Sequence, residues 1–150
     1  METQRKFNDY QSCATNSEIM ASLDTAKGEQ VVFSCIVIKF NRWNMKQERT
    51  FLLTNQYLYN IKKSEVQRRI AVNSIKGVTK SLLANNTQFV IHIQNEYDYM
   101  FESDSRKEIF DALKYVFHQM HGFNLPIFGV NDKLKDYATT KKDIQNGYEI

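Results

Sequence analysis

The sequence contains little of what disulfide-bonded, secreted or membrane-spanning proteins need. It has only two cysteines, Cys13 and Cys35, which lie far apart. They are too few for a disulfide framework, and they suit a reducing compartment. No segment approaches the roughly 18 consecutive apolar residues of a transmembrane helix, and residues 1–12 lack the apolar core of a secretory signal. We therefore expect a cytoplasmic protein with one domain and appended tails.

Residues that would support catalysis or cofactor binding are also scarce. The five glycines fall into neither of the glycine-rich spacings that cradle phosphates. His118 and His121 have a permitted ligand spacing on a helix, but no cysteine or carboxylate pattern completes a metal site with them or with His92. The acidic run over residues 96–104 is explained by exposed strand and turn positions. We expect no enzymatic activity, no metal and no cofactor.

What the sequence does contain is a series of short apolar segments. Hydrophobic residues make up 42% of the chain, which is enough for a core. Within residues 57–62, Tyr57, Tyr59 and Ile61 alternate with other residues in the period of a half-buried strand. Segments of this kind, separated by turn residues, predict seven strands. They cover residues 31–40, 49–54, 57–62, 66–72, 74–82, 88–93 and 97–102.

The hydrophobic period changes after the last predicted strand. Ser105 and Glu108 form a capping-box pattern, and apolar residues then recur at helical spacing as far as Gly122, a suitable C-terminal cap. This order predicts an α+β fold, a strongly bent seven-stranded antiparallel sheet or partial barrel capped by a C-terminal helix. The domain is expected over residues 29–122. Residues 1–28 form an N-terminal arm, in which Ser17 can cap a short helix, and residues 123–150 form a C-terminal tail.

Positive charge is concentrated in one part of the chain. Between Lys39 and Lys80, ten basic and two acidic residues give a net charge of +8, so the remainder carries −5 of the total of +3. An asymmetry of this size predicts an anionic partner. Nucleic acid is not expected, because the nearby aromatic residues alternate as a core face does and no RNA-binding motif is present.

Three motifs follow one another in the basic part of the chain. They are Lys46-x-x-Arg49-x-x-Leu52-Leu53-Thr54-x-x-x-Leu58-Tyr59, Arg68-Arg69-Ile70 and Ile75-x-Gly77-Val78. In this order and spacing, residues 31–121 resemble the tail-homology domain of class I myosins. The resemblance implies a pleckstrin-homology-like fold and a peripheral membrane anchor that uses basic residues of its first two strands. We expect such a domain standing alone, without motor or neck.

The resemblance also implies where an anionic head group would bind. Carried over by position, the anion-binding residues are Lys39, Arg42, Lys46, Arg49, Arg68 and Arg69. Arginine suits bidentate contacts with phosphate. Trp43 and Met45 lie at the same turn and are candidates for insertion into the membrane interface. The chain departs from the phosphoinositide pattern at Gln47, where that pattern has a basic residue.

Two functions remain open. In the first, the chain is a non-catalytic adaptor whose basic region docks on a membrane containing phosphoinositides and links it to the cytoskeleton. In the second, it is a structural component of a large cytoskeletal assembly, such as a ciliary or microtubule complex. Its basic surface would then meet an acidic protein such as tubulin or an axonemal protein, and residues 1–28 and 123–150 would bind protein partners.

Overall fold

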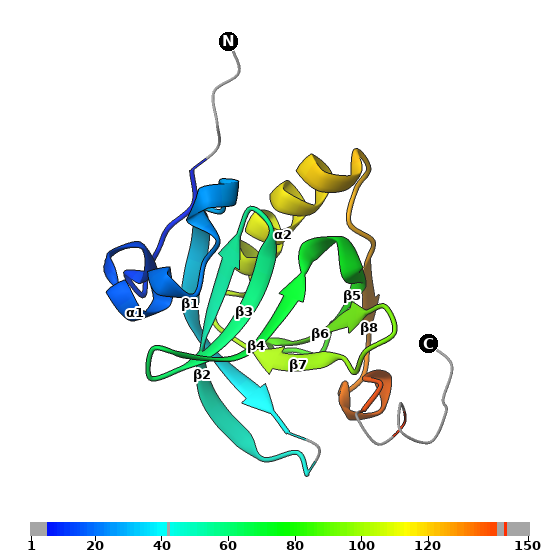
Figure 1. The fold of residues 1–150 in the computed structure, drawn as a ribbon. Coiled ribbons are helices and arrows are strands. Elements are labelled where there is room, and N and C mark those ends of the chain that lie inside the picture. Colours follow the sequence, from blue (N-terminus) through cyan, green and yellow to red (C-terminus); the bar gives the residue numbers. More distant parts are fainter. Residues whose placement is uncertain (1–5, 42, 141–142, 144–150) are drawn as a thin grey trace.

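The structure is a computed structural model that describes residues 6–41, 43–140 and 143. Its centre is one bent sheet of eight strands in the order β4-β3-β2-β1-β7-β6-β5-β8 (Figure 1). The strands are β1 (Val31–Phe40), β2 (Lys46–Thr54), β3 (Tyr57–Lys62), β4 (Glu65–Ala71), β5 (Ile75–Ser81), β6 (Gln88–Ile93), β7 (Tyr99–Glu102) and β8 (Ile127–Val130). The neighbouring strands of β1 to β7 pair antiparallel, as the sequence predicts.

The inner face of the sheet is closed by α2 (Arg106–His121). Aromatic side chains from several strands meet the helix there, and the Phe89 and Phe110 rings lie 5.2 Å apart in an edge-to-face arrangement. Full burial of each such side chain contributes about 1.5–3 kcal/mol. The β1–β2 hairpin projects away from α2, at the opposite end of the molecule (Figure 1). The predicted α+β architecture, a bent sheet capped by one helix, is confirmed.

The two ends of α2 compare differently with the sequence pattern. Gly122 ends the helix with a φ of 75°, as expected of a C-terminal cap. At the other end the predicted capping box is wrong, because the Ser105 side chain makes no capping hydrogen bond. The Glu108 carboxylate instead accepts hydrogen bonds from the hydroxyl of Tyr10, in the N-terminal arm. The Glu108 side chain, which the capping box would use, is therefore bound to the N-terminal arm.

The N-terminal arm packs on the outer face of the sheet. It contains the 3₁₀ turns Cys13–Thr15 and Thr25–Lys27 and the helix α1 (Ser17–Ala21), which is capped by Asn16 and not by Ser17. Apolar residues of the arm form a buried cluster with β2 and β3: Cys13, Ile19, Leu23, Leu52, Tyr59 and Ile61. The prediction of a half-buried strand over residues 57–62 is therefore wrong, because the arm covers its second face.

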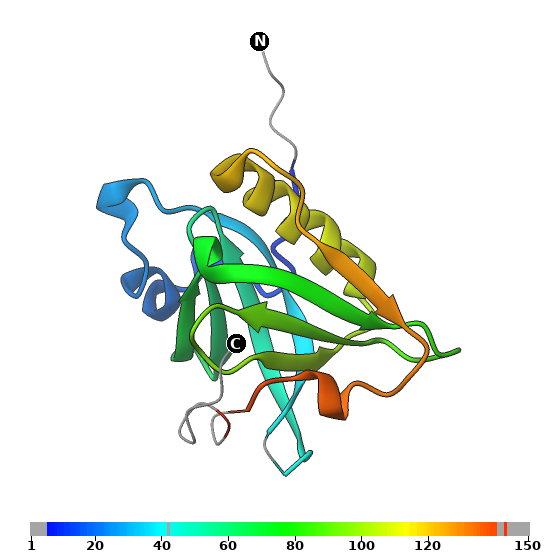
Figure 2. The same cartoon turned by 90° about the vertical axis from the view of Figure 1, so that its right-hand side faces the viewer.

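The C-terminal segment adds to the same sheet. β8 pairs with β5 in parallel, a strand that lay unrecognised within the predicted tail (Figure 2). Beyond β8, Leu134 is fully buried against Phe40, Val90 and Met100 on the outer face, and the 3₁₀ turn η4 (Lys135–Tyr137) follows. No helix among the described residues is long and apolar enough to cross a membrane.

Candidate anion-binding site

Strand register brings three predicted cations to the inner face of the sheet. Arg49 pairs with Val37, and Arg68 pairs with Asn60. Because directly paired residues share a face, and Val37 belongs to the buried core, Arg49 points inward. Lys39 lies two residues beyond Val37 on β1 and therefore also points inward. Asn60 pairs in turn with Phe51 of the core, so Arg68 points inward as well.

These cations lie beyond the core, where the β1–β2 and β6–β7 hairpins end. We call this position the basic mouth and define it by Lys39, Arg49, Arg68, Asn60 and Tyr99. Burial lowers the pKa of Lys39 from its ordinary value, and the charges of Arg49 and Arg68 lower that pKa further. The basic mouth thus holds three like charges close enough to interact, which makes it a favourable position for an anion.

Two tyrosines fix the position of Arg68. Its guanidinium carbon lies 3.6 Å from the ring centroid of Tyr97 and 4.5 Å from that of Tyr99. Its Nη2 donates a hydrogen bond of 2.7 Å to the backbone oxygen of Tyr97, and lies 3.6 Å from a carboxylate oxygen of Glu96. Burial raises the pKa of the Tyr99 hydroxyl, so this group remains a hydrogen-bond donor at neutral pH.

Several buried polar atoms in the basic mouth lack a partner within the described part of the chain. They are Arg49 Nε, Arg68 Nη1, the Tyr99 hydroxyl oxygen and Asn60 Oδ1. A buried polar group left unpaired costs about 1–3 kcal/mol. Three of these four groups can donate a hydrogen bond. Their arrangement offers donors and positive charge to a ligand that carries oxygen acceptors.

The other predicted anion-binding residues lie elsewhere. Lys46 is on the outer face, where its Nζ lies 3.0 Å from a Glu102 carboxylate oxygen and 5.8 Å from the ring centroid of Phe40. Arg69 is also on the outer face, with its guanidinium 4.3 Å from the ring centroid of Tyr57. Arg42 falls outside the described residues. The basic mouth thus unites three of the six predicted cations.

The predicted insertion residues lie at the tip of the β1–β2 hairpin. The side chains of Trp43 and Met45 are 67% and 62% exposed, which is unusual for large apolar residues and suits contact with a membrane interface. Sequence reasoning did not identify Asn60, Tyr97 or Tyr99 as site residues. Tyr97 and Tyr99 have the period of a core face, and Asn60 falls on the face opposite Tyr57, Tyr59 and Ile61, so the sequence carries no signal that marks these three as site residues.

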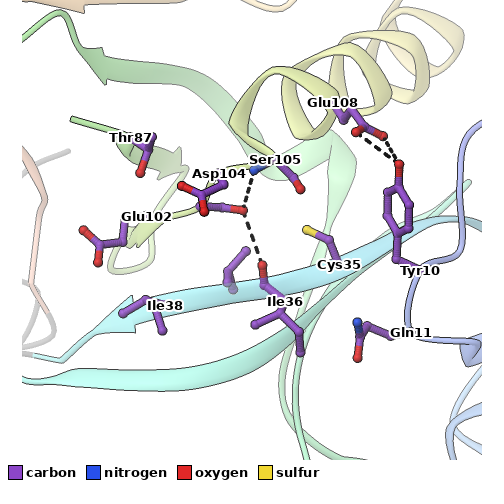
Figure 3. A pocket seen from close by; sticks show the side chains of 12 residues that line it. Tyr10, Gln11, Cys35, Ile36, Ile38, Thr87, Glu102, Asp104, Ser105 and Glu108 are labelled. Carbon is purple, nitrogen blue, oxygen red and sulfur yellow. Dashed lines mark hydrogen bonds between the residues drawn. The ribbon is translucent and has the colours of Figure 1, made fainter. Parts of the chain in front are cut away.

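A second hollow, beside the N-terminal arm, has the opposite charge. It has a volume of about 480 Å³ and lies between the N-terminal arm, β1 and the start of α2 (Figure 3). Its carboxylates are Glu102, Asp104 and Glu108. We call it the acidic hollow. Its charge disfavours anions, so the basic mouth is the candidate anion site. Among the residues that the structure describes, no three metal-ligating side chains gather.

Comparison with known proteins identifies the family. A protein family described as "Unconventional myosin tail, actin- and lipid-binding" matches residues 1–143. The chain belongs to this family. It is 32% identical over 133 residues to the myosin IB heavy chain of Dictyostelium discoideum, which is 82% of this chain and 12% of that protein. It is 30% identical over 114 residues to myosin heavy chain IB of Acanthamoeba castellanii, or 71% of this chain and 10% of that protein.

Solved structures show the fold. The hSac2 domain of the human phosphoinositide phosphatase Sac2 has a TM-score of 0.57 at 13% identity, covering 84% of this chain and 93% of that one. A Slm1 pleckstrin-homology domain, described with a ligand in a non-canonical site, has a TM-score of 0.50 at 19% identity, covering 58% and 97%. The resemblance to the class I myosin tail and the pleckstrin-homology-like fold are confirmed. The ciliary and tubulin predictions gain no support from these relatives.

Proposed function

We propose that this chain is a non-catalytic adaptor that docks on anionic membranes, with the basic mouth holding a phosphate of a phosphoinositide head group. The observation that carries the proposal is the group of buried, unpaired polar atoms beside Lys39, Arg49 and Arg68. Membership of a family described as actin- and lipid-binding supports the lipid as the anion. It also supports a link from that membrane to the cytoskeleton.

Physical chemistry gives the proposal its expected strength. A cation near an anionic leaflet contributes about 1 kcal/mol. Charge-assisted hydrogen bonds from arginine to phosphate add to this and impose an orientation. The exposed Trp43 and Met45 stand on the same hairpin as Lys39 and Arg49, so their insertion into the interface would occur together with head-group binding. Charge and apolar contact therefore act at one end of the molecule.

The scaffold alternative has weaker support. It needs the terminal arms to be available for protein partners. In the structure the apolar residues of the N-terminal arm pack on β2 and β3 of the same chain. Leu134 of the C-terminal segment is likewise buried against the chain's own sheet. These buried side chains of both segments are therefore used within the domain, although Phe123 and Phe128 of the C-terminal segment remain exposed.

The test compares two charge reversals that change the net charge equally. Arg49→Glu alters the basic mouth, whereas Arg69→Glu alters the outer face. Co-sedimentation would measure the binding of each full-length variant to phosphatidylcholine vesicles containing a few per cent phosphatidylinositol bisphosphate. We expect Arg49→Glu to weaken binding by about 30-fold, which corresponds to about 1 kcal/mol for each of two charge units. Arg69→Glu should weaken it less than about fivefold, because an exposed distant charge is screened by salt.

Equal losses in the two variants would show that binding depends on overall charge and not on the basic mouth, and would overturn the proposal. Circular dichroism of both variants checks that they fold. Vesicles with the same surface charge supplied by phosphatidylserine separate head-group recognition from charge attraction. Binding that is equally tight to both kinds of vesicle would contradict the assignment to phosphoinositides.

A further inference from the structure

A second groove adjoins the basic mouth. It lies between the end of β1 with its hairpin, the β6–β7 hairpin and the segment around η4, and has a volume of about 520 Å³. This size falls within the range of about 300–1,000 Å³ found for small-molecule sites. Its apolar lining residues are Phe40, Trp43, Tyr97, Tyr99, Met100 and Ala138. We call this cavity the aromatic groove.

The C-terminal wall of the aromatic groove is held in place by the rest of the fold. Two hydrogen bonds join Thr139 to Asp98. Asp98 N donates to the backbone oxygen of Thr139 at 2.8 Å, and Thr139 N donates to the Asp98 carboxylate at 3.0 Å. That carboxylate also accepts from Ile93 N at 3.0 Å and lies 2.9 Å from His92 Nδ1. Leu134 is fully buried just before this wall. The groove is therefore formed before any ligand arrives.

Lys39, at one end of the groove, favours a ligand with one anionic end. Lys39 lines the aromatic groove and also belongs to the basic mouth, so the two sites are continuous. Lys135, Asp136 and Asp98 also line the groove. The Asp98 carboxylate already accepts hydrogen bonds from Ile93 and Thr139. The rest of the lining is mixed, with Asn41, Asn44, Thr139 and Thr140 among its polar residues, but aromatic and apolar surface makes up its larger part and favours hydrocarbon.

We propose that the aromatic groove receives the glycerol-proximal part of an acyl chain of the same phospholipid whose phosphate lies in the basic mouth. This inference rests on the proposed function. Its occupant follows from continuity with the basic mouth, from the shared Lys39 and from the exposed Trp43 at the groove's edge. Burial of one methylene group increases affinity about fourfold. A phospholipid whose acyl chain enters the groove must therefore bind more tightly than its head group alone.

The experiment uses the fact that Trp43 is the sole tryptophan in the chain. Calorimetry would compare inositol trisphosphate, a head group without a chain, with dioctanoyl phosphatidylinositol bisphosphate below its micellar concentration. We expect the lipid to bind at least about tenfold more tightly, from a few buried methylene groups. Trp43 emission should shift to the blue with the lipid and not with the head group.

Two variants fill the groove without touching the cations of the basic mouth. Ala138→Phe and Thr140→Phe should reduce lipid affinity to that of the head group while leaving head-group affinity unchanged. Ala84→Phe is the matched control, because Ala84 is exposed in the loop between β5 and β6 and does not line the groove. Head-group binding by each variant serves as its test of folding.

The outcomes separate the two proposals. The acyl-chain inference is wrong, and the proposed function stands, if the head group binds but the acyl chain adds no affinity. The same holds if both groove-filling variants keep the full difference in affinity between lipid and head group. If neither the head group nor the lipid binds the wild-type protein, the proposed function fails and the inference fails with it.

Discussion

The basic mouth and the acidic hollow lie at different positions along β1 and differ in how their polar groups are paired. In the acidic hollow, the Glu102 carboxylate is paired with Lys46 and that of Glu108 accepts from Tyr10. Ser103 Oγ donates to the backbone oxygen of Ile36 at 3.3 Å (Figure 3). In the basic mouth, like charges lie together, and Arg49 Nε, Arg68 Nη1 and the Tyr99 hydroxyl have no hydrogen-bond partner among the described residues.

The difference in hydrogen-bond pairing between the two sites indicates which of them can bind a ligand. Paired polar groups hold elements together, as the hydrogen bonds from Tyr10 to Glu108 join the N-terminal arm to α2. Unpaired buried donors and crowded cations cost free energy, and a fold retains them where a ligand repays the cost. The two sites should therefore respond with opposite signs when their polar groups are removed.

The largest expected effect comes from moving charge between the two sites. The double variant Arg49→Glu with Asp104→Arg keeps the net charge of the chain, but takes charge from the basic mouth and places it at the acidic hollow. Binding to phosphoinositide vesicles should still fall by about 30-fold, since about 1 kcal/mol is lost for each charge unit moved from the membrane-facing end. Vesicle co-sedimentation measures it, and binding within threefold of wild type would erase the distinction between the sites.

A smaller effect tests the paired character of the acidic hollow. Ser103→Ala removes the hydrogen bond to Ile36 and the one that Ser103 Oγ accepts from Ser105 N at 3.0 Å. We expect the free energy of unfolding to fall by about 1 kcal/mol, the net worth of a typical hydrogen bond. Urea unfolding followed by circular dichroism measures it. Stability equal to wild type would show that these contacts do not hold the turn before α2.

The opposite sign is expected in the basic mouth. Lys39→Gln removes one of the crowded cations, so the ligand-free protein should become more stable by roughly 0.5 kcal/mol at neutral pH. The pKa of Lys39 is lowered in the folded state. Between that lowered pKa and the ordinary value of about 10.4, the unfolded chain binds more protons, so wild-type stability rises with pH. The advantage of the variant should shrink on approach to pH 10.

Thermal unfolding at pH 7 and pH 10 follows this difference. A variant that is less stable than wild type at both pH values would contradict the crowding of cations in the basic mouth.

The smallest expected effect is that the two cysteine thiols do not react with a thiol reagent while the protein is folded. Burial raises the pKa of Cys13 to about 11 and that of Cys35, which lines the acidic hollow, to about 12. Only the thiolate is nucleophilic, so neither thiol should react with a disulfide reagent at pH 8 while the protein is folded. Both should react after unfolding in guanidinium chloride. Rapid labelling of Cys35 in the folded protein would show that the acidic hollow opens to solvent.

Much of the fold follows from local patterns in the sequence. The predicted bounds of β1, β3 and β6 agree with the structure, because alternating and β-branched residues there end at clear turn residues. β8 was missed because its pairing depends on Val78 to Ser81, about fifty residues earlier in the chain. The burial of both faces of β3 was missed for the same reason: Tyr59 and Ile61 pack under the arm, more than thirty residues away, while Leu58 belongs to the main core.

The site could be predicted only as a set of basic residues. Arg68 and Arg69 are neighbours in sequence, yet one points into the basic mouth and the other stacks on Tyr57 outside. Which one points inward depends on the register of β4 against β3, and that register shifts between Asn60 and Ile61. The pairing of Lys46 with Glu102 likewise depends on a contact between distant segments.

The parallel pairing of β8 has a consequence for recognition by strand addition. Without β8, β5 would present a free edge to any extended peptide. The chain fills that edge with its own residues at the high effective concentration of a tethered segment, so an outside peptide would have to compete with it. The fit is close at Gly77, where an added Cβ would lie 3.1 Å from the backbone oxygen of Pro126. This edge is thereby reserved for the chain itself.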